Sequence, residues 1–175
     1  MPFLKKKIIY GCESRGDAQS PYLSRWTLLS TKLGAVYLHL FHRSDADEMH
    51  DHPWSFISVV LWRGYVEETP SPGLEWRTVS VAEGEDLIAS GEGWTFGAYF
   101  IGDTMHVFRS VGRDRKRVWP GMVLLRPASW VHRVELIDEK PAITLIIRGP
   151  YVRQWGFWTR NGWQFWRDYF TERGC

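Results

Sequence analysis

The amino-acid sequence predicts an all-β fold, a sandwich or a barrel, and two observations support this. Short runs of β-branched and aromatic residues dominate from about residue 22 to residue 150, and Gly, Pro, Asp and Ser separate them. The runs recur at a spacing of roughly 8–12 residues, and none of them shows a sustained helical periodicity. Many short strands at such a spacing are typical of sandwiches and barrels.

The expected strands follow one another with turn residues between most of them. Residues 31–34, Thr-Lys-Leu-Gly, predict a hairpin turn, and residues 70–73, Pro-Ser-Pro-Gly, predict another. The acidic, glycine-containing run 83–92 is expected to be a loop, and the basic run 113–117 a solvated hairpin tip. The strands are expected at residues 25–30, 35–42, 56–62, 65–69, 76–81, 94–100, 104–111, 122–125, 131–137 and 142–148.

The length of 175 residues fits one domain, 1–175, with a barrel at about 22–150, an N-terminal arm at 1–21 and a C-terminal extension at 151–175. The extension is rich in aromatic residues, and a short helix there would show Trp163, Trp166 and Phe170 on one face. We expect these rings to be buried, because a large exposed apolar patch is rare on monomers. A lid over the barrel, a dimer surface and a cap on its open end are the alternatives.

Composition excludes several classes of protein. The net charge of +2 gives no support for binding nucleic acid, and no apolar run approaches a membrane span or the core of a signal peptide. The two cysteines, Cys12 and Cys175, are too few for a disulfide-stapled secreted domain. We therefore expect two free thiols in a protein of the reducing cytoplasm.

The sequence His50-Asp51-His52 is the strongest candidate for a functional site. In a β-strand, alternate side chains share one face, so the two imidazoles point the same way. Two histidines placed like this can hold one metal ion, with nitrogen–metal distances of about 2.0–2.1 Å. An HxH pair on a strand is equally compatible with two surface histidines, so the pair needs further support.

The wider spacing resembles the two motifs of the cupin superfamily. Its first motif is Gly, five residues, His-x-His, three or four residues, Glu, six residues, Gly. Its second is Gly, five residues, Pro-x-Gly, two residues, His, three residues, Asn. Every spacing is kept in this chain, and the corresponding residues are Ser44, His50, His52, Ile57 and Gly64 for the first motif, and Gly121, Pro127, Ser129, His132 and Leu136 for the second.

The resemblance implies a double-stranded β-helix, the cupin or jelly-roll barrel, with a divalent metal ion on His50, His52 and His132. The glutamate that usually supplies a fourth ligand is Ile57, which cannot bind a metal. Similar three-histidine cupins include thiol and diketone dioxygenases that use Fe(II), although the Ser-His-Tyr relay of the thiol dioxygenases has no counterpart here. Carboxylates that could restore a fourth ligand are Glu48, Asp51, Glu67 and Glu68, of which Asp51 is the poorest because it faces away from its neighbours.

Strand alternation also predicts what surrounds the ion. If position 57 faces inward, Ile57 and Val59 line one wall of a substrate pocket, and Trp130 and Val134 share the face of His132. His39 and His42 are three positions apart in one expected strand, so their side chains would lie on opposite faces and one of them would point into the barrel. The candidate catalytic residues are His42, His106, Arg126 and Arg148, and a packed histidine or a surface arginine is the structural alternative for each.

These residues leave three functions open. The first is a non-haem Fe(II) dioxygenase-like enzyme acting on a small molecule, with Zn, Ni or Mn as alternatives for the metal. The second is a metal-dependent isomerase or lyase that uses the ion as a Lewis acid. The third is a non-catalytic cupin that binds a metal or ligand, which the missing glutamate favours. A homodimer is left open, and neither membrane nor nucleic acid is expected as a partner.

Overall fold

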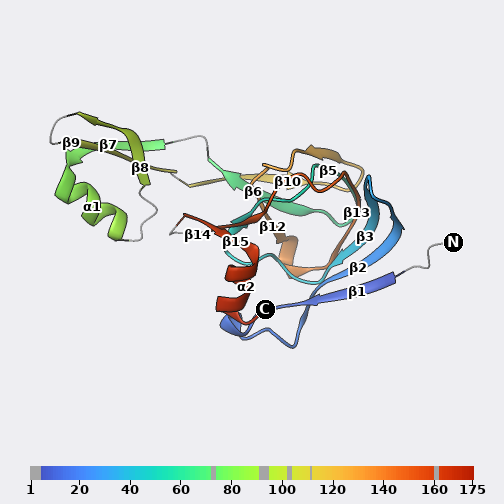
Figure 1. Ribbon diagram of the computed structural model, residues 1–175. Coiled ribbons are helices and arrows are strands. Elements are labelled where there is room, and N and C mark those ends of the chain that lie inside the picture. The colour runs from blue at the N-terminus through green and yellow to red at the C-terminus, as the bar shows by residue number, and fades with distance from the viewer. Residues whose placement is uncertain (1–4, 72–73, 91–94, 102–103, 111, 160–161) are drawn as a thin grey trace.

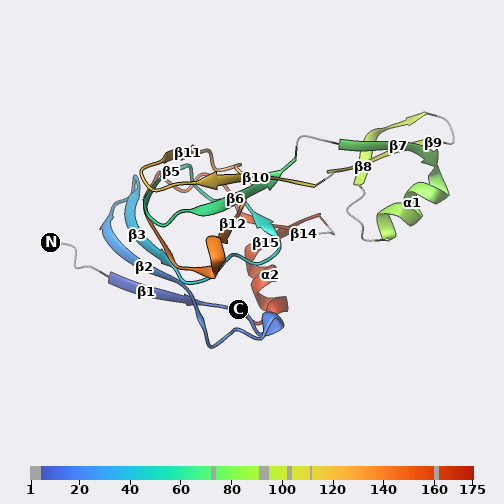
Figure 2. The ribbon, with the colours of Figure 1, turned by 180° about the vertical axis from the view of Figure 1, so that it is seen from behind.

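The computed structural model describes residues 5–71, 74–90, 95–101, 104–110, 112–159 and 162–175 (Figures 1 and 2). Most of these residues lie in strands of four sheets, and two short helices accompany them. No helix within these ranges is long and apolar enough to cross a membrane.

The largest sheet has six strands and forms one wall of the barrel (Figure 1). Strands distant in sequence lie side by side in it: β13 pairs with both β3 and β5, always antiparallel. In spatial order its strands are β1 (Lys5–Tyr10), β2 (Pro21–Ser30), β3 (Ala35–Phe41), β13 (Ala142–Arg148), β5 (Phe56–Trp62) and β11 (Val123–Arg126).

Two three-stranded sheets complete the barrel (Figure 2). The first contains β10 (Arg113–Val118), β6 (Tyr65–Pro70) and β12 (Arg133–Leu136). The second contains β15 (Gly162–Phe165), β14 (Gly156–Thr159) and β4 (Met49–His50). A buried apolar cluster packs between the walls and consists of Val60, Tyr65, Val118, Leu124, Val134, Leu136 and Ala142.

The two glycines retained from the cupin motifs both have a backbone conformation that other residues rarely adopt. The φ angle is 84° at Gly64 and 90° at Gly121. At Gly64 a Cβ atom would also lie 2.2 Å from the carbonyl oxygen of Val118. Glycine is therefore required there on two grounds, conformation and space.

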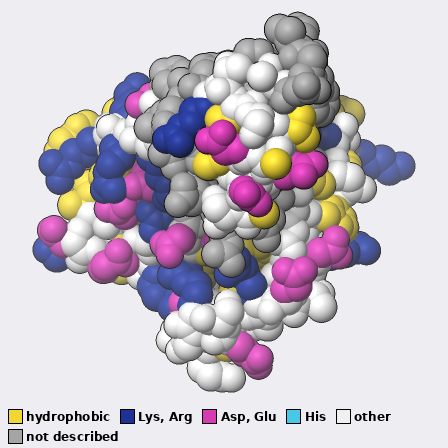
Figure 3. Space-filling view, turned by 90° about the vertical axis from the view of Figure 1, so that its left-hand side faces the viewer, with side chains coloured by type: hydrophobic (Ala, Val, Ile, Leu, Met, Phe, Trp, Pro, Cys, Tyr) yellow, Lys and Arg dark blue, Asp and Glu magenta, His cyan; other side chains and the backbone are white. Residues whose placement is uncertain are grey.

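A fourth sheet projects to one side of the barrel (Figure 1). It is built from β7 (Leu74–Ser80), β9 (Thr104–Ser110) and β8 (Thr95–Ile101), and helix α1 (Val81–Ala89) lies beside it. Buried Val107 packs against Val79 and Leu87. On the face of the molecule that includes this sheet, basic and acidic side chains are interspersed (Figure 3).

The expectation of a loop at 83–92 was wrong, because residues 81–89 form α1. The hydroxyl oxygen of Ser80 accepts a hydrogen bond from the backbone N–H of Glu83, at 3.3 Å. This is the Ser-x-x-Glu pattern that begins many helices, so the sequence carried a signal for the helix.

The basic run was also misplaced as a hairpin tip. Residues 113–117 belong to strand β10, which pairs with β6 along its whole length. The charges are tolerated in a strand because acidic residues face them: Glu68 accepts hydrogen bonds from Arg113 at 2.8 Å and from Arg115 at 2.6 Å.

The chain ends differ from expectation too. Residues 5–10 form β1 inside the large sheet, so the predicted N-terminal arm contains a strand that pairs with β2. Cys12 and Cys175 form a disulfide, so the prediction of free thiols was wrong. Cysteine count alone gave no indication that the two ends of the chain meet.

The C-terminal extension folds as a hairpin, β14–β15, followed by helix α2 (Trp166–Arg173). The expected helix is present, but it begins at Trp166, and Trp163 lies in the preceding strand. Two hydrogen bonds fix α2 to the loop before β4: Glu48 accepts from the hydroxyl of Tyr169 at 2.8 Å and from Arg173 at 2.5 Å.

Candidate metal centre

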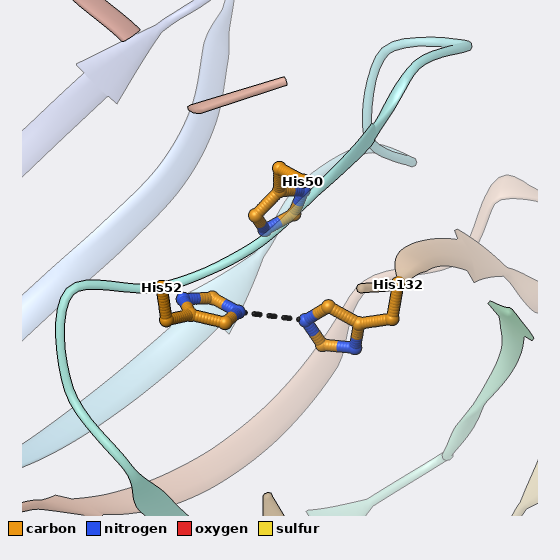
Figure 4. A group of neighbouring side chains, drawn as sticks. All are labelled: His50, His52 and His132. Atoms are coloured by element: carbon orange, nitrogen blue, oxygen red, sulfur yellow. Dashed lines mark hydrogen bonds between the residues drawn. The ribbon is translucent and has the colours of Figure 1, made fainter. Parts of the chain in front are cut away.

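Three histidines from two separate parts of the chain meet at one end of the barrel (Figure 4). The backbones of His50 and His132 exchange both of their hydrogen bonds, at 2.8 and 3.0 Å, so the two residues lie directly opposite each other. The backbone N–H of His52 donates to the carbonyl of Ala128 at 3.1 Å. Backbone pairing therefore brings the two motifs together.

The three rings converge on one point. Their candidate ligand nitrogens all lie within 4.8 Å of one another. The Nε2 atoms of His52 and His132 are 2.8 Å apart, as the dashed line in Figure 4 shows. Two nitrogens that each lie about 2.0–2.1 Å from one ion are separated by about 3 Å, so the spacing suits a shared divalent metal.

Burial keeps two of these rings, those of His50 and His52, in the neutral form that binds metals. Desolvation lowers the pKa of His50 to about 4, against a smaller opposite effect of Asp45. Desolvation, with the neighbouring rings, also holds the pKa of His52 well below its ordinary value. A neutral imidazole offers a lone pair to a cation, so the donor set fits the group that the cupin resemblance implies.

Glu67 orients His132 from behind. This carboxylate, only 2 % exposed, lies 2.9 Å from Nδ1 of His132, and it also accepts from Nε1 of Trp130 at 3.1 Å and from Arg126. Burial opposes ionisation of Glu67, but hydrogen bonds from His132 and Arg126 outweigh it and lower its pKa to about 2. A carboxylate bonded to the far nitrogen of a metal-binding histidine fixes the tautomer and the ring orientation.

None of the four carboxylates considered as a fourth ligand joins the histidine cluster in the described residues. Glu67 contacts His132 only through Nδ1, and Glu48 binds helix α2. Glu68 binds arginines on the opposite face of β6. Asp51 faces away as predicted, and accepts from the backbone N–H of Gly156 at 2.8 Å.

Asp45 is the carboxylate near His50, and sequence reasoning did not single it out. One of its oxygens lies 3.8 Å from Nδ1 of His50 and accepts from the backbone N–H of Val134 at 2.7 Å. The other accepts a hydrogen bond from the hydroxyl of Tyr22. Two hydrogen bonds therefore already hold the Asp45 carboxylate beside the site.

Phe56, not Ile57, occupies the place beside the histidines. The ring centroids of Phe56 and His52 are 4.7 Å apart. Along β5 the residues that line the cavity are Phe56 and Ser58, so Ile57 and Val59 fall on the other face of the strand, and their assignment to the pocket is corrected. A phenyl ring on this strand leaves no carboxylate from β5 near the cluster.

The second motif predicted two pocket residues, Val134 and Trp130, which lie in different places. Val134 lines the cavity together with His132. Trp130 does not, because residues 127–130 form a turn, in which the N–H of Trp130 donates to the carbonyl of Pro127 at 2.9 Å. Strand alternation therefore does not extend back to Trp130, whose indole supports Glu67 instead.

The four candidate catalytic residues do not gather at the cluster. His42 pairs with the hydroxyl of Ser24 at 3.0 Å, and Arg126 holds Glu67. Arg148 lies over Trp54, with 4.9 Å from its guanidinium carbon to the ring centroid. His106 falls in β9 of the projecting sheet, and its side chain lies outside the described part of the structure.

The histidines open into a cavity of about 410 Å³ enclosed by both walls of the barrel. The six-stranded sheet contributes four polar side chains to the lining. Sequence analysis considered only His39 of these four, which are Arg25, Tyr37, His39 and Thr144. Aromatic residues of the C-terminal extension close another side, namely Trp155, Trp166 and Phe170. Of the three roles considered for the extension, capping the barrel is the one that this packing supports.

No family model matches the sequence, and no curated protein does so either. Solved structures match in fold, among them a cupin domain from Bordetella pertussis, with a TM-score of 0.41 and 12% identity over 71% of this chain and 90% of that one. The structure itself is an antiparallel barrel in which the residues of the two motifs bring His50, His52 and His132 together in space.

Two enzymes are among the other solved structures that are similar to this chain. The DMSP lyase DddQ from Ruegeria pomeroyi matches with a TM-score of 0.46 and 13% identity, over 83% of this chain and 56% of the lyase. The polyketide cyclase RemF from Streptomyces resistomycificus matches with a TM-score of 0.46 and 11% identity, over 83% of this chain and 73% of the cyclase. At these identities the resemblance concerns the cupin fold alone.

Proposed function

We propose that this protein is a metal-dependent enzyme that acts on a small molecule. His50, His52 and His132 would bind its divalent ion, for which Fe(II) is the first candidate. The observation that carries the proposal is the position of the cluster. Three imidazoles converge in a cavity of about 410 Å³, and Glu67 fixes one of them from outside. A ligand-sized cavity beside an open metal site is the usual arrangement of a small-molecule active site.

With three protein ligands, a bound ion keeps open positions for substrate and, for iron, for dioxygen. The protein's own residues supply the remaining functions. Glu67 holds His132 in one tautomer, and Phe56 with the aromatic cap at Trp155 and Trp166 keeps the cavity largely apolar. An apolar lining limits the access of water to reactive species.

A metal-assisted isomerase or lyase is the second candidate, and the Tyr22–Asp45 pair favours it. Both residues line the cavity, and the Tyr22 hydroxyl donates to an Asp45 oxygen beside His50. Burial and the charge of Asp45 hold the pKa of Tyr22 well above its usual value, so Tyr22 retains a proton that it can donate or share. This pair provides a proton-handling group without a redox step.

The first test is elemental analysis of the purified protein beside the His50→Ala/His132→Ala double variant. We expect close to one divalent ion per chain in the parent and its loss in the variant. Equal metal content in both proteins contradicts the ligand assignment. Circular dichroism of the variant serves as the folding control.

The second test separates the two chemistries. The Fe(II)-loaded protein is incubated with a panel of small acids, thiols and diketones, and oxygen uptake is measured together with the products. Oxygen consumption that depends on substrate supports the dioxygenase. Product formation without oxygen uptake, retained when Zn(II) replaces Fe(II), supports the isomerase or lyase. A protein that holds metal and converts none of the panel supports the non-catalytic alternative.

Cytoplasmic location and a homodimer stay predictions, and the Cys12–Cys175 disulfide removes the reason for expecting free thiols in a reducing compartment. Size-exclusion chromatography with light scattering gives the oligomeric state directly.

A further inference from the structure

Three polar side chains form a row across the inner face of the six-stranded sheet. Arg25 on β2 lies opposite His39 on β3, and His39 lies opposite Thr144 on β13. Directly paired residues on one face have their Cβ atoms about 4.5–5.5 Å apart, so the row is a compact group. All three residues line the cavity that also contains the histidine cluster.

Arg25 carries a buried charge with no acidic partner. Its Nε donates to Nε2 of His39 at 3.0 Å, and its guanidinium lies over the ring of Tyr37, 4.8 Å from the centroid. Among the described residues, neither terminal nitrogen of Arg25 makes a hydrogen bond, and no carboxylate lies within ion-pair distance. A partly buried arginine without a counter-charge is costly for a protein to keep, because desolvation is not offset.

His39 cannot neutralise that charge. Burial, reinforced by the nearby Arg25, lowers the pKa of His39 to about 3, so the ring is neutral and accepts the Nε–H of Arg25. The ring therefore positions the guanidinium and leaves the paired terminal N–H groups of Arg25 for another acceptor.

Thr144 adds a second group without a partner. Its side chain is 1 % exposed, and its hydroxyl is the buried side-chain polar atom that finds no hydrogen bond among the described residues. Buried hydroxyls are normally satisfied, so an orphaned one on a residue that lines a cavity is a candidate contact for a bound molecule. Asp45, an acid in the same cavity, is already held by Tyr22 and the backbone of Val134.

We propose that Arg25 and Thr144 form a subsite for the carboxylate of a small, mostly apolar substrate whose other end reaches the three histidines. The planar guanidinium matches a carboxylate in two parallel hydrogen bonds, and a threonine hydroxyl can donate a third. Phe41, Ile146 and Phe56 line the cavity near this row and suit an aromatic or aliphatic body. The substrate class deepens the proposed function and rests on it only for the role of the metal end.

The test measures ligand binding to the metal-free protein, so that it does not depend on the metal site. Benzoate and its neutral analogue benzamide are titrated by calorimetry into the chelator-treated protein. We expect benzoate to bind at least about tenfold more tightly than benzamide, as a charge-assisted pair predicts. Arg25→Met should lose that preference, while Arg117→Met, which removes an equal charge from the exposed face of β10, should retain it.

Two milder variants keep the test informative if Arg25→Met does not fold. Arg25→Lys keeps the charge and loses the planar fork, so benzoate should bind more weakly than to the parent and more tightly than benzamide does. Thr144→Val removes the orphaned hydroxyl, so it should weaken benzoate binding and raise the melting temperature of the ligand-free protein. A role in packing alone would not move these two readouts in opposite directions.

Equal binding of benzoate and benzamide to the parent would overturn the subsite, as would unchanged benzoate binding in Arg25→Met. Metal content, measured in parallel, separates this failure from that of the proposed function. A parent that binds benzoate but no metal retains the subsite and loses the metal enzyme, and a parent that binds metal but not benzoate gives the reverse.

Discussion

The two faces of strand β6 carry adjacent glutamates that differ in what they support. Glu67 and Glu68 are both buried, at 2 % and 3 % exposure, and arginines bind both. Glu67 lies behind His132, and its partners are His132, Trp130 and Arg126. Glu68 faces the other way and holds Arg113, Arg115 and Arg133, which belong to the neighbouring strands β10 and β12.

This difference shows that burial and charge pairing do not identify a functional carboxylate by themselves. The deciding feature is what the partners do: a histidine that converges with two others, or arginines that join strands. We therefore expect substitutions of Glu67 to change metal binding and substitutions of Glu68 to change stability.

The largest effect is expected from Glu68→Ala. Removing this carboxylate leaves the mostly buried Arg133 without its main partner, and breaking a buried pair costs about 3 kcal/mol or more. Because Arg113 and Arg115 can turn to solvent, we place the loss in the free energy of unfolding at about 3 kcal/mol. Urea denaturation measures it, and metal affinity of the folded variant should equal that of the parent.

The next effect is expected from Glu67→Gln. The substitution keeps the shape and removes the charge that orients His132, and loss of such an outer carboxylate weakens metal binding by about 10–100-fold. Competition against a chromogenic chelator measures the affinity. Glu68→Gln, the same substitution at the next residue, is the matched control. A similar loss of metal affinity in that variant would contradict the difference between the two faces of β6.

Low pH should reduce the stability that Glu68 contributes to the fold. Burial opposes ionisation of Glu68, but hydrogen bonds from Arg113 and the charge of Arg133 outweigh it and lower its pKa below the ordinary value. The unfolded chain then binds a proton more readily than the folded one, so stability falls as pH falls below about 4.3. Unfolding measured between pH 6 and pH 3 should show a shallower decline for Glu68→Gln than for the parent.

The smallest effects concern the individual arginines on Glu68. Arg115 has a side chain that is 52% exposed, whereas that of Arg133 is 11% exposed and also donates to the carbonyl of Ala46 at 2.7 Å. Arg115→Met should therefore lower the melting temperature less than Arg133→Met does, because exposed pairs contribute little to stability. Equal decreases in melting temperature for the two variants would show that solvent exposure does not determine how much each ion pair contributes.

The histidines could be predicted because motif spacing records chain topology. The spacing within each motif and the pairing of the two motifs place His50 opposite His132 in the fold, and His52 joins them from just beyond the end of β4. Strand alternation failed at Ile57. The non-strand residues 51–55 separate β4 from β5, so alternation along one strand cannot tell which residues of the next strand face the barrel interior. The structure gives that place to Phe56.

Other features depend on long-range contacts that no local pattern records. Arg25 became notable only when its neighbours proved to contain no acid, and the basic run became a strand only because Glu68 faces it. Pairing of Cys12 with Cys175 required the ends of the chain to meet. In contrast, the Ser80-x-x-Glu83 pattern in the sequence is a local signal for the start of helix α1.

The disulfide between Cys12 and Cys175 converts nearly the whole chain into a ring, because the two residues are 163 positions apart. A ring of this size has far fewer unfolded arrangements than an open chain, and the loop-closure relation puts the difference at about 5 kcal/mol. The ring includes every strand from β2 to β15 and closes just after α2. A single cut in the backbone between Cys12 and Cys175 would therefore open the ring without separating the two fragments, because the disulfide still joins them.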